Sequence, residues 1–196
     1  MTRRLCIFIT ILSLCISGAM AQSGEIPTTQ ARFTRSSAQK GVGTSTDVIL
    51  VALPAATIAG VLIAKDWDGL KQGALTAATT LGMTYLLKYT VHEKRPDFSD
   101  SHSFPSAHTS ITFASAAFLQ RRYGWKFGGP AYALATYVGW GRIYAKKHHW
   151  WDVLAGAGIG AGSAYIFTRP FAKKHELAIA PFTDGKNWVV SAALTF

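Results

Sequence analysis

Cysteine is nearly absent from this sequence of 196 residues. Its two cysteines, Cys6 and Cys15, both lie within the first 21 residues. If that segment is removed, the remaining chain has no disulfide, no thiolate nucleophile and no cysteine ligand for a metal. Packing or a lipid bilayer must then hold the protein together.

The first 21 residues have the features of a secretory signal peptide. Two arginines form a basic start, an almost wholly apolar run follows, and an Ala-Met-Ala sequence ends at Ala21, with small residues at the positions that a signal peptidase reads. We expect cleavage before Gln22, and therefore an exported protein. An uncleaved membrane helix is the alternative, although the apolar run is short for a span.

Acidic residues are scarce as well. The chain has 10 Asp and Glu against 20 Lys and Arg, which gives a formal net charge of +10. This balance favours an anionic partner such as a nucleic acid, a membrane surface or a phosphorylated substrate. We exclude nucleic acid because the basic residues do not form one stripe and 49% of the residues are hydrophobic.

Beyond the signal, no apolar run reaches the roughly 20 residues that cross a bilayer core. Five shorter apolar stretches follow one another, at residues 48–64, 72–87, 109–120, 127–141 and 153–168. Each is apolar nearly all round, which is typical of helices buried in a protein core or a bilayer. The last is dense in small residues, which let helix backbones approach closely. We predict an all-α fold, a membrane-embedded bundle of about five helices; a soluble periplasmic bundle is the alternative.

The charges between these stretches bear on topology. With the mature N-terminus outside, the basic turns at 65–71, 121–126 and 169–174 lie inside, as the positive-inside rule favours. The turns at 88–95 and 142–147 are basic too, and they would lie outside. Their charge needs another cause.

Composition divides the chain into four segments. We predict a signal peptide over 1–21, a polar and flexible lead-in over 22–46, the helical bundle over 47–170 and a tail over 171–196. In the tail, two partly alternating stretches flank an Asp-Gly pair, which is a strong hairpin signal. We therefore expect a short C-terminal β-hairpin.

Three polar clusters interrupt the apolar stretches, and all three are predicted on the same side of the helices. The first, residues 88–96, places Lys88 near a helix end and Arg95 just beyond it. Two cations so close together favour an anion between them. The alternative is ordinary, because cations are common at helix C-termini and membrane edges.

The second cluster, residues 103–109, starts the next helix, because Ser is a good cap and Pro suits a first turn. A helix start offers free N–H groups and a favourable dipole to a phosphate. Ser106 adds a hydroxyl, and His108 lies in the first turn. The alternative is a capped helix with an incidental histidine.

The third cluster, residues 141–152, holds Arg142, two adjacent histidines and an acid. Asp152 lies four residues after His148 and three after His149, and both spacings meet on a helix. A carboxylate that accepts one ring N–H leaves the other nitrogen free as a nucleophile or base. Spacing does not choose between the two histidines, and a solvated basic turn is the alternative.

Together the clusters supply cations, hydrogen-bond donors and histidines, a set suited to phosphoryl transfer. No metal ligand set is apparent, so we expect neither a metal nor a cofactor. The chain resembles the type 2 phosphatidic acid phosphatase superfamily, whose signature is Lys, six residues, Arg-Pro; Pro-Ser-Gly-His; and Ser-Arg, five residues, His, three residues, Asp. The matching residues are Lys88 with Arg95-Pro96, then Pro105-Ser106-Ala107-His108, then Gly141-Arg142 with His148 and Asp152.

Two residues depart from that signature. Ala107 replaces the family glycine and keeps its backbone N–H, so anion binding should survive. Gly141 replaces the family serine and loses one hydroxyl.

The resemblance implies a role for each matching residue. His148 attacks phosphorus and forms a phosphohistidine, Asp152 holds His148, and His108 protonates the leaving oxygen. The residues implied to bind the phosphate are Lys88, Arg95, Ser106, Ala107 and Arg142.

The resemblance also implies a phosphorylated lipid as substrate, and a bacterial inner-membrane protein whose site faces the periplasm. Export and compact size favour lipid A, cut at its 4′-phosphate; undecaprenyl diphosphate and phosphatidylglycerol phosphate are close alternatives. A soluble periplasmic acid phosphatase of broad specificity is another alternative. A non-enzymatic membrane protein that binds anionic lipid is the last.

Overall fold

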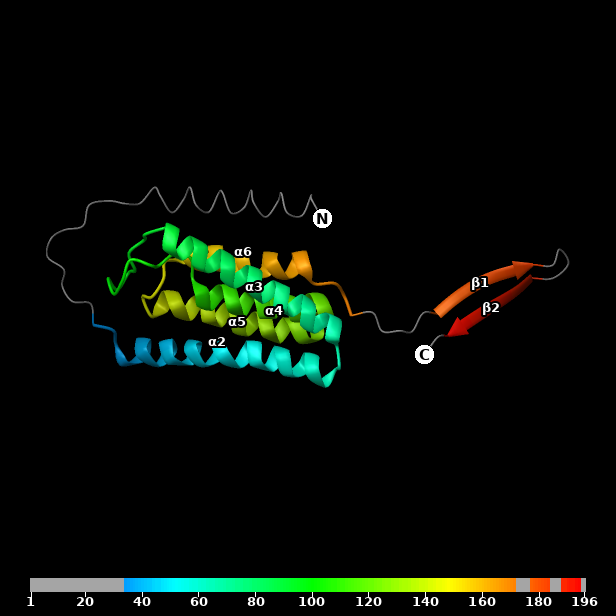
Figure 1. Cartoon of the computed structure of the whole chain (residues 1–196). Helices are drawn as coiled ribbons and strands as arrows, with labels where there is room; N and C mark the ends of the chain where they lie inside the picture. The colour runs from blue at the N-terminus through cyan, green and yellow to red at the C-terminus, as the bar shows by residue number, and fades with distance from the viewer. Residues whose placement is uncertain (1–33, 172–176, 184–187, 195–196) are drawn as a thin grey trace.

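The computed structural model describes residues 34–171 and the two segments 177–183 and 188–194. Five α-helices run side by side (Figure 1). The predicted all-helical bundle of about five helices is confirmed in this described part of the chain. In chain order the helices are α2 (Ser37–Ile63), α3 (Trp67–Thr90), α4 (Ala107–Tyr123), α5 (Trp125–Tyr144) and α6 (Trp150–Phe167).

The first helix of the bundle begins earlier than its composition indicates. The prediction of a flexible lead-in is wrong for residues 37–46, which form the first turns of α2. Ser36 caps this helix: its Oγ accepts from the Gln39 N–H at 3.2 Å, and Gln39 Oε1 accepts from the Ser36 N–H at 3.0 Å. Thr46 is then fully buried in the bundle. Capping and packing therefore outweigh a polar composition.

The central helix is α4, which contacts each of the other four helices. Two glycines allow α6 to approach it closely. A Cβ on Gly156 would lie 2.6 Å from the carbonyl oxygen of Ser106, and one on Gly160 would collide with the carbonyl of Ser110. The close approach predicted for the last helix is confirmed at these two positions. It holds the start of α4 against the start of α6.

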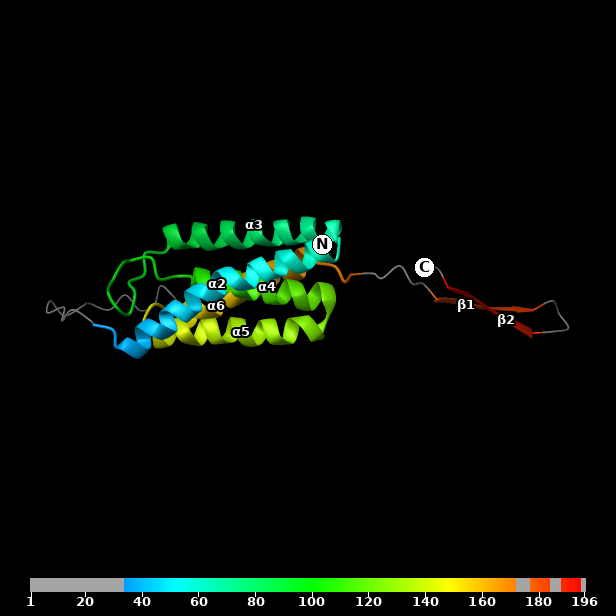
Figure 2. The same cartoon turned by 90° about the horizontal axis from the view of Figure 1, so that it is seen from below.

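The loops that join α3 to α4 and α5 to α6 lie at one end of the bundle, beside the start of α2 (Figures 1 and 2). Residues 88–108 and 142–152 therefore meet at this end, which we call the motif end. The three polar clusters lie on the same side of the helices, as predicted.

A buried ion pair ties the opposite end together. Arg122 donates to both carboxylate oxygens of Asp66, from Nε at 2.7 Å and from Nη2 at 2.5 Å. The Tyr123 hydroxyl donates to the same carboxylate at 2.8 Å, and Arg122 Nη1 donates to the Arg169 carbonyl. This network links the turn after α2, the end of α4 and the end of α6.

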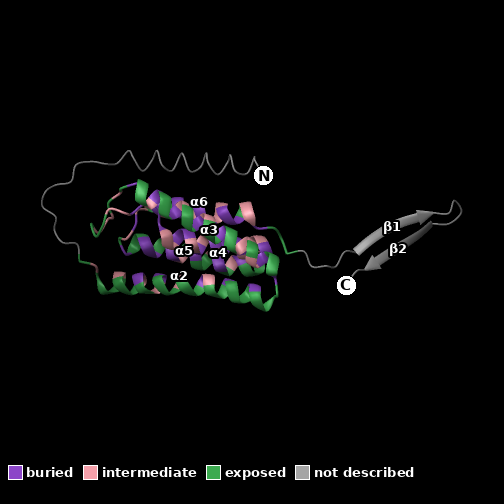
Figure 3. Cartoon of the chain, viewed as in Figure 1, coloured by how far each residue is buried: buried purple, intermediate pink, exposed green. Residues whose placement is uncertain are grey.

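Large apolar side chains are exposed on the outside of the bundle. Val51 is 68% exposed, Leu86 63% and Ile63 83%. Figure 3 shows α2 exposed over most of its length. Among the described residues, α2 is the one helix both long and apolar enough to cross a membrane.

The sequence predicts a signal peptide at one end of the chain and a β-hairpin at the other. The predicted signal peptide, 1–21, lies outside the described residues. In the tail, β1 (Leu177–Thr183) pairs antiparallel with β2 (Trp188–Leu194), and Ala180 faces Ser191 in the register. The turn between these strands also lies outside the described residues, so a stable C-terminal hairpin stays a prediction.

Candidate active site

The motif end gathers every residue that the sequence pointed to. Three segments supply them: the end of α3 with its following loop, the start of α4, and the end of α5 with the start of α6. Direct contacts join the segments, as described below. The residues brought together are Lys88, Arg95, Ser106, Ala107, His108, Arg142, His148 and Asp152.

Asp152 joins two of these segments. It lies in the first turn of α6 and is fully buried. Its Oδ2 accepts from the Ser103 hydroxyl at 2.5 Å and from the His149 backbone N–H at 2.8 Å. The Ser106 N–H donates to its backbone carbonyl at 3.0 Å. These bonds hold the loop before α4 against the start of α6.

The structure distinguishes the two adjacent histidines, which their spacing did not. The His148 side chain is 3% exposed, and its Nδ1 lies 3.4 Å from Asp152 Oδ2. The His149 side chain is 27% exposed, stacks on the Trp151 ring and also approaches Asp152, with its Nδ1 at 3.6 Å. The 3.4 Å contact is longer than an ordinary hydrogen bond, and such contacts tighten when substrate binds.

Their electrostatic surroundings are opposite. Burial lowers the pKa of His148 to about 4, and the charges of Arg95 and Arg142 act in the same direction. His149 lies among acids instead, where Asp152 first, and then Glu93, raise its pKa. At neutral pH His148 is therefore a neutral imidazole with nucleophilic character, while His149 is held toward its protonated form.

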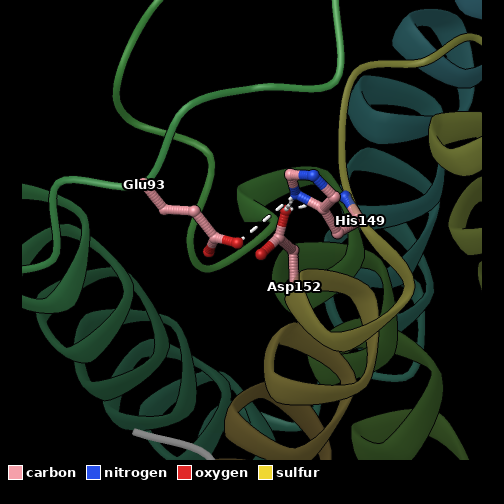
Figure 4. A group of neighbouring side chains, drawn as sticks. All are labelled: Glu93, His149 and Asp152. Carbon is pink, nitrogen blue, oxygen red and sulfur yellow. Dashed lines mark hydrogen bonds and ion pairs between the residues drawn. The ribbon is translucent and has the colours of Figure 1, made fainter. Parts of the chain in front are cut away.

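Glu93, His149 and Asp152 form a compact group, here called the His149 cluster (Figure 4). Their ligand atoms lie within 4.8 Å of one another, which is close enough to share a metal ion. The oxygens that face His149 already accept hydrogen bonds, however. Trp151 Nε1 donates to Glu93 Oε1 at 2.7 Å, and Asp152 Oδ2 accepts the two bonds given above. The contacts of His149 with both acids, which raise its pKa, account for the arrangement.

Glu93 is the acid of this cluster whose pKa is raised. Burial first, and then the negative charge of Asp152, raise the pKa of Glu93 to about 7. Below that pH Glu93 is therefore neutral, and Asp152 is the anion of the cluster.

The cations of the first cluster have partners already. Lys88 Nζ donates to the carbonyls of His102 and Pro105, at 2.8 and 3.0 Å. Arg95 pairs with Asp100 through Nε and Oδ1 at 2.8 Å. Lys88 lies close enough to Arg95 for their charges to repel. Lys88 thus braces the loop that leads into α4, and both cations border the motif end.

The third cation is paired by an acid from α2. Asp47 Oδ1 accepts from Arg142 Nη1 at 2.9 Å and lies 2.8 Å from His108 Nε2. The Arg142 side chain is 7% exposed, whereas that of Asp47 is 60% exposed. One carboxylate oxygen therefore contacts two residues that the sequence pointed to.

The start of α4 is open to an anion. Ser106 is its N-cap residue, and no side-chain hydrogen bond caps the helix. The first N–H groups, at Ala107 and His108, are thus available together with the helix dipole. The Ser106 side chain is fully buried, and its Oγ accepts from the Thr109 hydroxyl at 3.0 Å.

Sequence reasoning missed four acids and one serine at this end. Glu93, Asp97 and Asp100 lie in the loop after α3, and Asp97 pairs with Lys147 at 3.2 Å. Ser103 lies three residues before Ser106, and a short bond joins it to Asp152. Asp47 carried a usable signal: it is a single acid bordering the first apolar stretch, on the side where the three clusters were expected.

With this geometry established, similarity to known proteins identifies the family. The model of the PAP2 superfamily matches residues 69–176, which is more than half of the chain. This chain belongs to the PAP2 superfamily. The resemblance seen in the sequence is therefore confirmed.

Two PAP2-like relatives illustrate the similarity. Lipid A 4'-phosphatase of Helicobacter pylori (strain J99) is 34% identical over 124 residues, which cover 58% of this chain and 63% of that protein. Lipid A 1-phosphatase of Porphyromonas gingivalis is 35% identical over 100 residues, covering 49% and 22%. The chain thus spans less than two thirds of the first relative and under a quarter of the second.

A solved PAP2 structure shares the fold. The transmembrane PAP2-type phosphatidylglycerolphosphate phosphatase of Bacillus subtilis superposes with a TM-score of 0.56 at 22% identity. The match covers 85% of this chain and 92% of that one. At this identity the likeness concerns the fold alone.

Proposed function

We propose that the chain is a phosphatase that removes a phosphate from a lipid through a phosphohistidine at His148. The observation that carries this proposal is the environment of His148. Its imidazole is buried and neutral, Asp152 lies beside its Nδ1, and the cations Arg95 and Arg142 act on it. Nε2 is then the free nucleophilic nitrogen.

In the first step, His148 Nε2 attacks the phosphorus. The N–P bond forms as the bond from phosphorus to the lipid oxygen breaks, and protonated His108 gives its proton to that oxygen. Asp152 stabilises the positive charge that develops on the His148 ring. The dephosphorylated lipid leaves as an alcohol.

In the second step, water attacks the phosphohistidine. Neutral His108 takes a proton from the water as the new O–P bond forms and the N–P bond breaks. The products are inorganic phosphate, free His148 and protonated His108. Lys88, Arg95, Arg142, Ser106 and the N–H groups of Ala107 and His108 would hold the phosphate oxygens, which carry most of the charge in the transition state.

The substrate we propose is lipid A. In support, the relatives named above are lipid A phosphatases of the 4′ and the 1 position, and a choice between these positions is left to experiment. An apolar cavity of about 340 Å³ between α2, α3 and α4 also suits a lipid. It starts near Ile111, one turn from His108. Acyl chains gain from such a surface in proportion to the apolar area they bury.

We further propose that the bundle lies in the inner membrane with the motif end toward the periplasm. The exposed apolar side chains and the candidate span α2 support the embedding. The site supports the orientation: Arg95 and Arg142 border the proposed phosphate site, which gives the basic turns at the motif end a cause other than topology. The signal peptide over residues 1–21 and the tail over residues 171–196 remain predictions.

His148→Asn tests the nucleophile. We expect turnover to fall at least about 1,000-fold, because removing the nucleophile removes the covalent route. The matched control is His92→Asn, a histidine of the same end with an exposed side chain, which should retain activity. Acid-labile phosphate on the wild-type protein during turnover, lost in His148→Asn, is the direct readout. Full activity in His148→Asn would refute the mechanism.

A substrate panel then tests the lipid. Purified protein is given lipid A phosphorylated at the 4′ position, at the 1 position or at both, with undecaprenyl diphosphate and phosphatidylglycerol phosphate alongside, and products are read by mass spectrometry. Activity recovered without detergent from the soluble periplasm would favour a broad acid phosphatase. Lipid binding without hydrolysis would favour the non-enzymatic alternative. Loss of a lipid A phosphate in cells should weaken the binding of cationic antimicrobial peptides, because it removes negative charge.

A further inference from the structure

Asp47 lies outside the family signature, yet it contacts the centre of the site. Its Oδ1 accepts from Arg142 Nη1 at 2.9 Å and lies 2.8 Å from His108 Nε2. Because Arg142 and His108 contact the same oxygen of Asp47, that oxygen fixes the position of one relative to the other. The carboxylate comes from α2, whereas Arg142 ends α5 and His108 begins α4. A single acid therefore joins three helices at the place where the phosphate is expected.

Gly141 explains how α2 comes so close. A Cβ at this position would lie 2.5 Å from Thr46 Cγ2 and 3.1 Å from Val42 Cγ1. The shorter distance is a steric clash, so a residue with a Cβ does not fit beside Thr46. We call this gap in the surface of α5, into which Thr46 packs, the Gly141 notch. The family signature has serine here. The departure is thus a packing feature, and it places Thr46 and Asp47 beside Arg142.

Thr46 adds a second contact to the same guanidinium. Its hydroxyl donates to the Gly43 carbonyl at 2.7 Å, which leaves a lone pair for Arg142 Nη1 at 3.4 Å. Nη1 is then fully occupied by α2. Arg142 Nε is buried and has no hydrogen-bond partner. A buried guanidinium N–H without a partner is costly, and a phosphate oxygen would satisfy it.

We propose that Asp47 is a positioning residue for this reaction. It orients His108 as the acid and turns Arg142 so that Nε faces the phosphate. The Gly141 notch allows α2 to bring Asp47 close enough to do so. The inference rests on the proposed phosphatase function. It deepens that function by adding a helix that the signature does not include.

The charges around His108 give the physical reason. Burial first, and then the charge of Arg142, lower the pKa of His108 to about 4, and Arg95 acts in the same direction. A general acid must carry its proton before the leaving group departs. Asp47 is the carboxylate that faces His108 at hydrogen-bond distance, and it favours the protonated ring. The same contact fixes which ring nitrogen points toward the leaving oxygen.

The test compares two leaving groups in Asp47→Asn, using the full chain in detergent. Hexyl phosphate has a poor leaving group that needs a proton, whereas p-nitrophenyl phosphate has a good one that does not. We expect kcat/KM, which reports phosphoryl transfer to His148 and not the later hydrolysis, to fall about 10-fold to 100-fold more for hexyl phosphate than for p-nitrophenyl phosphate, the lower range of general acid catalysis. KM should rise for both, since Arg142 is less well placed.

Asp68→Asn is the matched control, because it is the same acid-to-amide change on an exposed side chain at the opposite end of the bundle. It should leave all four constants unchanged. An equal fall in kcat/KM for both substrates would overturn the proposal, because a general loss of structure affects both alike. So would unchanged kinetics in Asp47→Asn.

Binding of orthovanadate gives a readout that needs no turnover. We expect Asp47→Asn to bind vanadate several-fold more weakly than the wild type and Asp68→Asn. Equal or tighter binding would overturn the positioning role, because it would mean that Asp47 merely competes with the anion. If the wild type hydrolyses neither ester and none of the lipids in the panel above, the proposed function fails, and the vanadate comparison still decides the role of Asp47.

Gly141 provides an independent variant. Gly141→Ser restores the family residue, yet we expect it to reproduce the kinetic pattern of Asp47→Asn, because the new Cβ pushes Thr46 away. Thr46→Ser in the same chain removes Cγ2 and keeps the hydroxyl, and it should recover part of the loss. A fully active Gly141→Ser protein would overturn the role assigned to the Gly141 notch.

Discussion

Glu93→Gln should change how the stability of the protein depends on pH. Glu93 lies in the His149 cluster, its side chain is 14% exposed, and burial beside Asp152 raises its pKa from 4.5 to about 7. Glutamine keeps the shape and still offers an oxygen to Trp151 Nε1. It removes only the ability to ionise.

The sign of the effect follows from the direction of the shift. Below pH 4.5 the carboxyl is protonated in both the folded and the unfolded chain, so it adds no pH dependence. Between pH 4.5 and 7 the unfolded chain ionises Glu93 while the folded protein keeps the proton, and folding loses stability as the pH rises. The shift to about 7 corresponds to a loss of about 3 kcal/mol, complete above pH 7.

The assay is the unfolding free energy of wild type and Glu93→Gln in the same detergent at pH 4.5, 6 and 8. The variant should gain on the wild type as the pH rises, by up to about 3 kcal/mol between the first and last values. Asp68→Asn is the control for an acid-to-amide change at an exposed position. A difference between Glu93→Gln and wild type that is the same at pH 4.5 and pH 8 would refute the reasoning.

Two further predictions follow from other contacts. Asp66→Ala leaves the buried Arg122 without its carboxylate and should lower the unfolding free energy by about 3–5 kcal/mol, measured against Asp68→Ala, which should have little effect. Hydrolysis should persist in EDTA, because the proposed mechanism uses His148 and His108 and no metal, and His149 already contacts both acids of its cluster. Activity that EDTA abolishes and a divalent metal restores would show instead that the cluster binds a metal.

The sequence predicted the elements that have local signals. The five apolar stretches lie in five helices, and the three clusters of fixed spacing lie together at the motif end of the bundle. The helices are longer than the apolar stretches, however. Helix α2 starts at Ser37 because a capping box and the burial of Thr46 stabilise a segment whose composition is polar. Composition gives only the average polarity of a segment. It does not reveal a helix cap or a specific contact with another helix.

The site was predicted less evenly than the fold. The signature residues come together because each cluster has a fixed internal spacing. Asp47 and Ser103 have no periodic relation to those clusters, so only the packed helices reveal that they touch Arg142 and Asp152. Likewise, spacing allowed both histidines, and it is burial that lowers the pKa of His148 while neighbouring acids raise that of His149.

The docking of α2 has an evolutionary consequence. The family model matches residues 69–176 and so does not include α2. The catalytic signature and the helix that supports it can therefore diverge at different rates. If α2 positions Arg142 and His108 as proposed, substrate preference can change through α2 and Gly141 while the signature residues stay the same. Relatives that share the signature but carry another first helix form a natural series in which that separation can be followed.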